Sequence, residues 1–326
     1  LEVFMNHRCK ICGNIDGNII YNVKERILNK GDVFAYLHCA HCGTLMLNEP
    51  IEDMSRWYAP DYNPFIKRRQ REKETGIRLR NKLLVELIIH MKGKRFFKYI
   101  VRLENLDIQF KRLYGLFLSK KAEILDVGCA TGGWLYSLYD MGWKHVTGID
   151  LYCPEIASCD RKWKFISGDI FSIHNQVYDC ITFNHSFEHM ENPLEVLRKV
   201  YSLLSDRGVC IISIPLCGGI SWKLFGLDYC QIDAPRHWYL YTPQSMKHLC
   251  DSAGLVLEQI YYDSKGGILH ISDGYKKTEK SHAELCNFYP RSRKIKYDKI
   301  AEKANDEGNG DEAVFVIKKG TLRYKR

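Results

Sequence analysis

The stretch AEILDVGCATGGWL, residues 122–135, decides the fold. Its apolar run at residues 124–127 predicts a buried strand, which stops at Gly128 and turns through small residues into a helix that begins near Trp134. Glycines in such a turn let a ligand lie against the backbone, and the free N–H groups of the first helical turn point at that ligand. The stretch therefore predicts a nucleotide-type pocket at the end of a strand.

Two nucleotide classes use glycine turns of this kind. Gly128, Ala130 and Gly133 can be aligned with the dinucleotide fingerprint, whereas Gly128, Ala130 and Gly132 follow the GxGxG spacing of S-adenosylmethionine enzymes. Asp126 lies two positions before the first glycine. It favours the second class, because a carboxylate there repels a pyrophosphate and attracts the ammonium group of a methionine.

Carboxylates also end the next two predicted strands. Strand 144–150 ends at Asp150, which is placed to accept hydrogen bonds from both ribose hydroxyls, and strand 164–169 ends at Asp169, where an adenine amino group would lie. With these features the chain resembles the class I S-adenosylmethionine-dependent methyltransferases over roughly its last two thirds, with Ala130 in place of the middle glycine. The resemblance implies a cofactor site made of Asp126, Gly128, Cys129, Ala130, Gly132, Asp150, Leu151, Asp169, Ile170 and Asn184.

Strand and helix patterns alternate through the rest of the chain. Strands are expected at 178–183, 208–215, 255–261 and 313–318, with helices at 193–204 and 242–253. This alternation predicts an α/β fold with a Rossmann-like, seven-stranded, mostly parallel sheet over residues 122–326, whose ligands collect at the carboxyl ends of the strands. Residues 263–312 are polar and basic, and they are expected to form a partly helical, mobile insertion.

Two matching knuckles, CKICG at residues 9–13 and CAHCG at residues 39–43, lie near the amino terminus. Each presents two thiols followed by a glycine that can adopt a positive φ, which predicts one zinc ion bound by Cys9, Cys12, Cys39 and Cys42. Short strands at 15–21 and 33–37 would bring the knuckles together, so residues 5–50 are predicted to be a zinc ribbon. Four thiolates leave no open coordination position, which makes this zinc structural.

The chain has 13 cysteines, an odd number, and nine of them are scattered outside the knuckles. This distribution favours a reducing cytoplasm over a disulfide framework. No apolar run in the sequence reaches the length of a membrane span.

Residues 51–121 join the zinc ribbon to the sheet domain. An aromatic segment at 56–65 offers Tyr58 and Tyr62 as residues that reach the substrate, a feature that resembles sugar methyltransferases with an amino-terminal zinc module. Residues 66–121 carry 17 lysines and arginines and 5 acidic residues. Their apolar residues recur with a helical period, which predicts a basic helical cap.

The net charge of +9 belongs to this basic segment. Its cations would attract phosphate, either on a lipid-linked or nucleotide-linked sugar or, through weak contacts, on anionic headgroups at the inner face of the membrane. RNA is a third partner and is less favoured, because aromatic interleaving is thin and no RNA-binding motif is present.

Two histidines stand out as acid–base residues. His189 follows Glu188 at the end of the fourth predicted strand, and the pair resembles the Glu-His of many small-molecule methyltransferases of this class, in which the histidine faces the acceptor. His237 lies in the sequence PRHWYLYTP, which is similar to a segment that recurs in the same broad family, and Arg236 beside it would suit an anionic substrate.

Together these features predict S-adenosylmethionine-dependent methylation of a small polar acceptor, with a sugar hydroxyl in glycan or secondary-metabolite synthesis as the favoured one. Two alternatives remain: an RNA methyltransferase that grips RNA with its zinc ribbon and basic helices, and a non-catalytic interaction protein with a relic pocket. RNA binding that weakens steeply with salt would indicate the first alternative, and failure to bind the cofactor would indicate the second.

Overall fold

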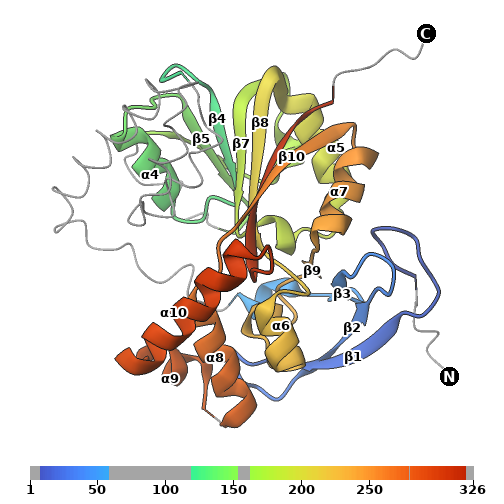
Figure 1. Cartoon of the computed structure of the whole chain (residues 1–326). Helices are drawn as coiled ribbons and strands as arrows, with labels where there is room; N and C mark the ends of the chain where they lie inside the picture. The colour runs from blue at the N-terminus through green and yellow to red at the C-terminus, as the bar shows by residue number, and fades with distance from the viewer. Residues whose placement is uncertain (1–7, 59–118, 153–161, 279, 321–326) are drawn as a thin grey trace.

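The computed structural model describes residues 8–58, 119–152, 162–278 and 280–320 (Figure 1). The basic segment at 66–118 and Tyr62 lie outside these residues, so the helical cap and the second substrate tyrosine stay predictions. Within the described ranges, no helix combines the length and the apolar character that crossing a bilayer requires.

A seven-stranded sheet forms the centre of the larger domain (Figure 1). Its order is β10-β11-β8-β7-β4-β5-β6. The strands are β4 (Ile124–Val127), β5 (Val146–Asp150), β6 (Lys164–Ser167), β7 (Tyr178–Asn184), β8 (Leu204–Pro215), β10 (Leu255–Tyr262) and β11 (Glu312–Lys319). Neighbours from β6 to β8 are parallel, whereas β11 is antiparallel to β8 and β10. The predicted Rossmann-like, mostly parallel sheet is confirmed.

Helices cover both faces of this sheet. Residues of β4 alternate between two cores: Leu125 packs with α5 (Pro193–Leu203) and α7 (Pro243–Ser252), and Ile124 packs with α4 (Gly133–Asp140). A strand that is apolar on both faces is typical of a parallel sheet buried between helices. Every residue of β4 is buried, which explains why the apolar run that decides the fold is continuous rather than alternating.

The insertion before the last strand contains three helices, α8 (Gly266–Lys277), α9 (His282–Asn287) and α10 (Arg291–Asp306). They lie beside α6 (Ile220–Phe225), at one end of the sheet (Figure 1). Leu269, Tyr297 and Ala301 form a separate small core between α8 and α10. The insertion is therefore a packed helical unit, more regular than the sequence predicted.

A second sheet joins the cysteine module to the larger domain. Its order is β1-β2-β3-β9, with β1 (Ile19–Lys24), β2 (Val33–His38), β3 (Leu45–Leu47) and β9 (Tyr239–Leu240). The sequence predicted the first two strands, with the first a few residues early, and missed the other two. The loop that carries Arg236 and His237 leads directly into β9, and β9 pairs with β3 of the cysteine module.

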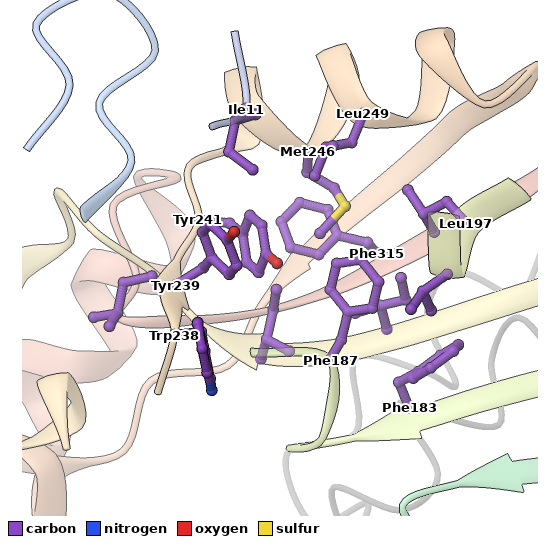
Figure 2. Close-up of a cluster of buried hydrophobic side chains, with 14 of the residues drawn as sticks. Ile11, Phe183, Phe187, Leu197, Trp238, Tyr239, Tyr241, Met246, Leu249 and Phe315 are labelled. Atoms are coloured by element: carbon purple, nitrogen blue, oxygen red, sulfur yellow. The ribbon is translucent and has the colours of Figure 1, made fainter. Parts of the chain in front are cut away.

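The two modules also share one hydrophobic core. Phe183, Phe187, Tyr241 and Tyr239 form a row of aromatic rings with successive centroids 5.3–5.5 Å apart, running from β7 to β9. Figure 2 shows Ile11 of the first knuckle beside this row, and Ile11 belongs to the same buried cluster. The small module therefore completes its core with side chains of the larger domain.

A buried ion cluster ties the modules together. The Arg236 guanidinium lies 2.7 Å from Glu25 of the cysteine module and 2.6 Å from Asp233, and it also donates to the Trp57 carbonyl. The Arg236 side chain has no exposed surface. The prediction that Arg236 suits an anionic substrate is therefore wrong, because two carboxylates neutralise its charge inside the protein.

We expect Glu25→Gln to lower the free energy of unfolding by about 3–5 kcal/mol, because it leaves the Arg236 charge undercompensated in a buried site. Urea titration followed by circular dichroism measures the loss. The matched control is Glu195→Gln, which breaks the exposed Glu195–Arg198 pair and should change stability by less than about 1 kcal/mol. Equal effects of the two substitutions would contradict the role of the cluster.

Candidate active site

Asp126 lies at the carboxyl end of β4, as the sequence predicted, and is 2% exposed. Its Oδ1 accepts hydrogen bonds from Thr182 Oγ1 at 2.6 Å and from Asn184 Nδ2 at 2.8 Å. Both donors belong to β7, the neighbouring strand. These two hydrogen bonds hold the carboxylate beside the glycine turn, which begins at Gly128. Thr182 was not among the predicted residues.

The turn after β4 runs through left-handed backbone. Gly128, Ala130 and Gly132 have φ values of 72°, 44° and 75°. A Cβ at Gly128 would overlap Ser186, and one at Gly132 would overlap the Trp163 ring, so both positions need glycine for space as well as for backbone angle. Ala130 holds a left-handed conformation that costs about 1–2 kcal/mol for a residue with a Cβ.

Asp150 is fixed beside this turn at the end of β5. Its Oδ2 accepts from the Ala130 N–H at 2.8 Å and its Oδ1 accepts from the Tyr152 N–H at 2.9 Å. Leu151 and Tyr152, next in the chain, leave about half of their surface exposed, 55% and 48%. The site thus offers a buried carboxylate next to open apolar surface, which suits the hydroxyls and the flat base of a nucleoside.

The third predicted carboxylate has a local structural role. Asp169 Oδ1 accepts from the N–H groups of Phe171 and Ser172, which caps a short 3₁₀ turn, η3 (Ile170–Ser172). Ile170 is 2% exposed, whereas Phe171 beside it is 43% exposed at the end of β6. The predicted cofactor residues at the ends of β4, β5 and β7 lie around the glycine turn, because these three strands are neighbours in the sheet. Asp169 and Ile170 follow β6, which is two strands away from β4.

Glu188, His189 and His237 come together beside the β7 end. Glu188 and His189 lie on a 3₁₀ turn, η4 (Phe187–His189), and the loop before β9 brings His237 against them. The two imidazole centroids are 4.7 Å apart, and His237 Nε2 lies 3.9 Å from Glu188 Oε1. The structure therefore unites the three residues that the sequence predicted to be catalytic, although 48 positions separate His189 from His237.

Backbone carbonyls orient both imidazoles. His189 Nδ1 lies 2.8 Å from the Arg236 carbonyl, and His237 Nδ1 lies 2.8 Å from the Gln231 carbonyl. A carbonyl accepts only, so each Nδ1 carries the proton and each Nε2 keeps a lone pair. Burial lowers the pKa of His189, and the neighbouring His237 lowers it further.

Glu188 is fully buried. Burial alone would raise the pKa of its carboxyl, but the three surrounding histidines outweigh burial and lower that pKa. The nearest of these, His185, has its Nδ1 3.6 Å from Glu188 Oε1. His185 was not among the predicted site residues, and its only sequence signal is its position in the NHSFEH segment.

Tyr58 reaches this cluster from the segment after the cysteine module. Its hydroxyl lies 3.0 Å from His189 Nδ1, and its ring stacks on Tyr152, with centroids 5.2 Å apart and planes 15° apart. Burial raises the pKa of the Tyr58 phenol. Tyr58 therefore bridges the end of β5 and the histidine pair, and its contact with the substrate stays a prediction. Tyr152 was missed because nothing in its sequence context distinguishes it.

The four knuckle cysteines form a second site. The Sγ atoms of Cys9 and Cys42 and those of Cys12 and Cys39 are each 3.6 Å apart, and all four lie within 4.8 Å of one another. Tetrahedral coordination with Zn–S bonds of about 2.3 Å places sulfur atoms about 3.8 Å apart, so the thiols fit zinc without rearrangement. The glycines after the knuckles have positive φ, as predicted: Gly13 76° and Gly43 71°.

The sheet order, the left-handed glycine turn and the acidic strand ends define a class I S-adenosylmethionine-dependent methyltransferase fold. Residues 102–260 match the family model described as a methyltransferase domain. The enzyme class predicted from the sequence is thereby confirmed: the chain carries an S-adenosylmethionine-dependent methyltransferase domain. No curated protein matches the chain.

Solved structures similar to this chain include two methyltransferases and a cyclopropane synthase. The 1,6-didemethyltoxoflavin-N1-methyltransferase of Burkholderia thailandensis is 13% identical, with 87% of this chain and 97% of that one covered and a TM-score of 0.42. The CcbJ methyltransferase of Streptomyces caelestis is 12% identical, with 65% and 89% covered and a TM-score of 0.42. The cyclopropane synthase MmaA2 of Mycobacterium tuberculosis is 14% identical, with 70% and 87% covered and a TM-score of 0.44. Likenesses at this level do not identify the acceptor.

We expect Gly132→Ala to destabilise the domain by about 2–4 kcal/mol and to weaken cofactor binding, because the new Cβ meets Trp163 and the backbone angle is left-handed. Denaturant titration and calorimetry with S-adenosylhomocysteine measure the two effects. Gly133→Ala is the matched control, since Gly133 has open space around it and opens α4. Similar losses in both variants would contradict this explanation.

Proposed function

We propose that this protein methylates a hydroxyl group of a small polar acceptor, with a sugar in glycan or secondary-metabolite synthesis as the substrate class. The observation that carries the proposal is the meeting of Glu188, His189 and His237 beside the glycine turn, with two Nε2 lone pairs directed by backbone carbonyls. A hydroxyl acceptor must lose a proton during methyl transfer, and a placed base contributes on the order of 10²–10⁴ in rate.

The cofactor roles follow from the fixed carboxylates. Asp126, with the backbone at Gly128 and Gly132, would hold the methionine end, and Asp150 would bind the ribose hydroxyls. Leu151 and the residues after β6, Asp169 and Ile170, would border the adenine. When bound, S-adenosylmethionine supplies a methyl carbon on a positively charged sulfur. The protein's task is to align the acceptor with that carbon, and such alignment is worth about 7–11 kcal/mol.

The acceptor would lie beside Tyr58 and the histidine pair. Tyr58 closes this space from the cysteine-module side, and its stacking on Tyr152 leaves its hydroxyl beside His189. With Arg236 neutralised internally, binding of a phosphate-bearing sugar would depend on the basic residues at 66–121. RNA methylation would depend on the same segment, and no described contact favours it.

The thiols support a reducing compartment for this function. None of the described cysteines forms a disulfide bond, and those outside the knuckles include the buried Cys129, Cys180, Cys210, Cys217 and Cys250. We propose a cytoplasmic enzyme, with contact to the inner face of the membrane if the basic segment binds anionic headgroups.

Calorimetry tests the cofactor assignment. We expect S-adenosylhomocysteine to bind and NADH not to bind, because Asp126 attracts an ammonium group and repels a pyrophosphate. Asp150→Ala should weaken S-adenosylhomocysteine on the order of 10–100-fold, through loss of charged hydrogen bonds to the ribose. Asp179→Ala, which removes a carboxylate at the amino end of β7, should leave affinity unchanged. NADH binding without S-adenosylhomocysteine binding would overturn the proposal.

Metal analysis tests the structural zinc. We expect one cysteine-bound zinc ion per chain in the wild-type protein, lost in Cys39→Ser together with thermal stability, because the knuckles close the small module. Cys286→Ser is the control, since this cysteine is exposed on α9. Retention of zinc by Cys39→Ser would show that these thiols do not bind the ion.

A further inference from the structure

The Glu188 carboxylate is buried without a hydrogen bond. Its side chain has no exposed surface, and neither oxygen has a hydrogen-bond partner among the described residues. An ionised carboxylate in such a place costs several kcal/mol unless a cation or donors compensate it. The buried guanidinium of Arg236, next to His237 in the sequence, is already paired with Glu25 and Asp233.

The nearest imidazole, that of His185, has its Nδ1 3.6 Å from Glu188 Oε1, and the imidazoles of His189 and His237 do not supply the missing donors. Both Nδ1 protons point to backbone carbonyls, and His237 Nε2 is 3.9 Å from Glu188 Oε1, beyond hydrogen-bond distance. His237 Nε2 therefore keeps a lone pair near this carboxylate, and it also lies 3.8 Å from Asp233 Oδ2. Glu188, His189 and His237 each offer one ligand atom, and these atoms lie within 4.8 Å of one another.

This pattern is the one that metal-binding histidines show. In metal sites an imidazole that binds through one nitrogen usually donates its other N–H to a carbonyl or carboxylate, which fixes the tautomer and the ring. Two nitrogens and one carboxylate oxygen are a common set for divalent transition-metal ions and leave positions open. Ligand atoms about 3.0–3.5 Å apart around such an ion would require the present 3.9 Å contact to shorten by about 0.4–0.9 Å.

We propose that Glu188, His189 and His237 bind a divalent transition-metal ion, separate from the zinc of the four cysteines, that coordinates the acceptor oxygen. Only the coordination of the acceptor rests on the proposed function. A nitrogen lone pair that binds the ion cannot also accept a proton, so the ion takes the place of a histidine base: it lowers the pKa of the acceptor hydroxyl, whose proton leaves to solvent water. The oxygen then forms the O–CH₃ bond as the C–S bond of S-adenosylmethionine breaks, and the sulfur keeps the electron pair.

Cobalt(II) is the probe, added to protein whose cysteine site is loaded with zinc. We expect one Co²⁺ to bind per chain by calorimetry, with visible d–d absorption but without the near-ultraviolet bands of cobalt–thiolate bonds. X-ray absorption at the cobalt edge should show nitrogen and oxygen ligands only. This measurement uses the wild-type protein, so it does not depend on whether any variant folds.

Substitutions then identify the ligands. Glu188→Gln and His237→Asn should each weaken Co²⁺ binding on the order of 100-fold or more. The matched controls Glu191→Gln and His174→Asn change exposed residues outside the cluster and should bind Co²⁺ as the wild type does. Absence of a bound Co²⁺ in the zinc-loaded wild type, sulfur ligands at the cobalt, or unchanged binding by both cluster variants would each overturn the proposal.

Calorimetry with S-adenosylhomocysteine on the same samples separates this inference from the proposed function. If S-adenosylhomocysteine binds and Co²⁺ does not, the metal site is ruled out and the methyltransferase proposal stands. If Co²⁺ binds and S-adenosylhomocysteine does not, the metal site is established and its role in methyl transfer is ruled out.

Discussion

The Arg236 guanidinium is the buried charge on which the arrangement of the active site depends. It is neutralised by Glu25, 211 positions earlier in the chain, and by Asp233 in its own loop. Since a buried charge is tolerated only while its partners stay in place, the loop from Asp233 to His237 is held against the cysteine module. This loop supplies both His237 and the carbonyl that orients His189. One ion cluster therefore sets the position of both histidines.

The cysteine module consequently forms one wall of the candidate active site. Its Tyr36 hydroxyl donates to the His237 carbonyl, and the Thr242 hydroxyl donates to the Cys42 carbonyl in the second knuckle. Tyr58, which follows the module, reaches His189. A zinc ion held by four thiolates needs no contact with substrate to influence catalysis, because loss of the fold around it would release the loop that carries His237.

Protein groups hold two carboxylates of the predicted cofactor site in place. Asp126 and Asp150 are held by donors of the protein itself, and Asp150 also restrains the turn through the Ala130 N–H. Rigid carboxylates lose little entropy when a ligand binds, which favours affinity. The strained Ala130 persists because the flanking glycines and Asp150 determine the path of the turn.

The sequence by itself determined the sheet, the glycine turn, the acidic strand ends and the thiol knuckles. These features depend on residues close together in the chain: an apolar run, a CxxCG repeat, a carboxylate two positions before a glycine. Only the tertiary structure decided that β3 pairs with β9, that Arg236 is neutralised rather than free for substrate, and that Glu188, His189 and His237 meet. Such contacts join segments up to 211 positions apart, and local patterns cannot encode them because packing of the whole chain selects the partner.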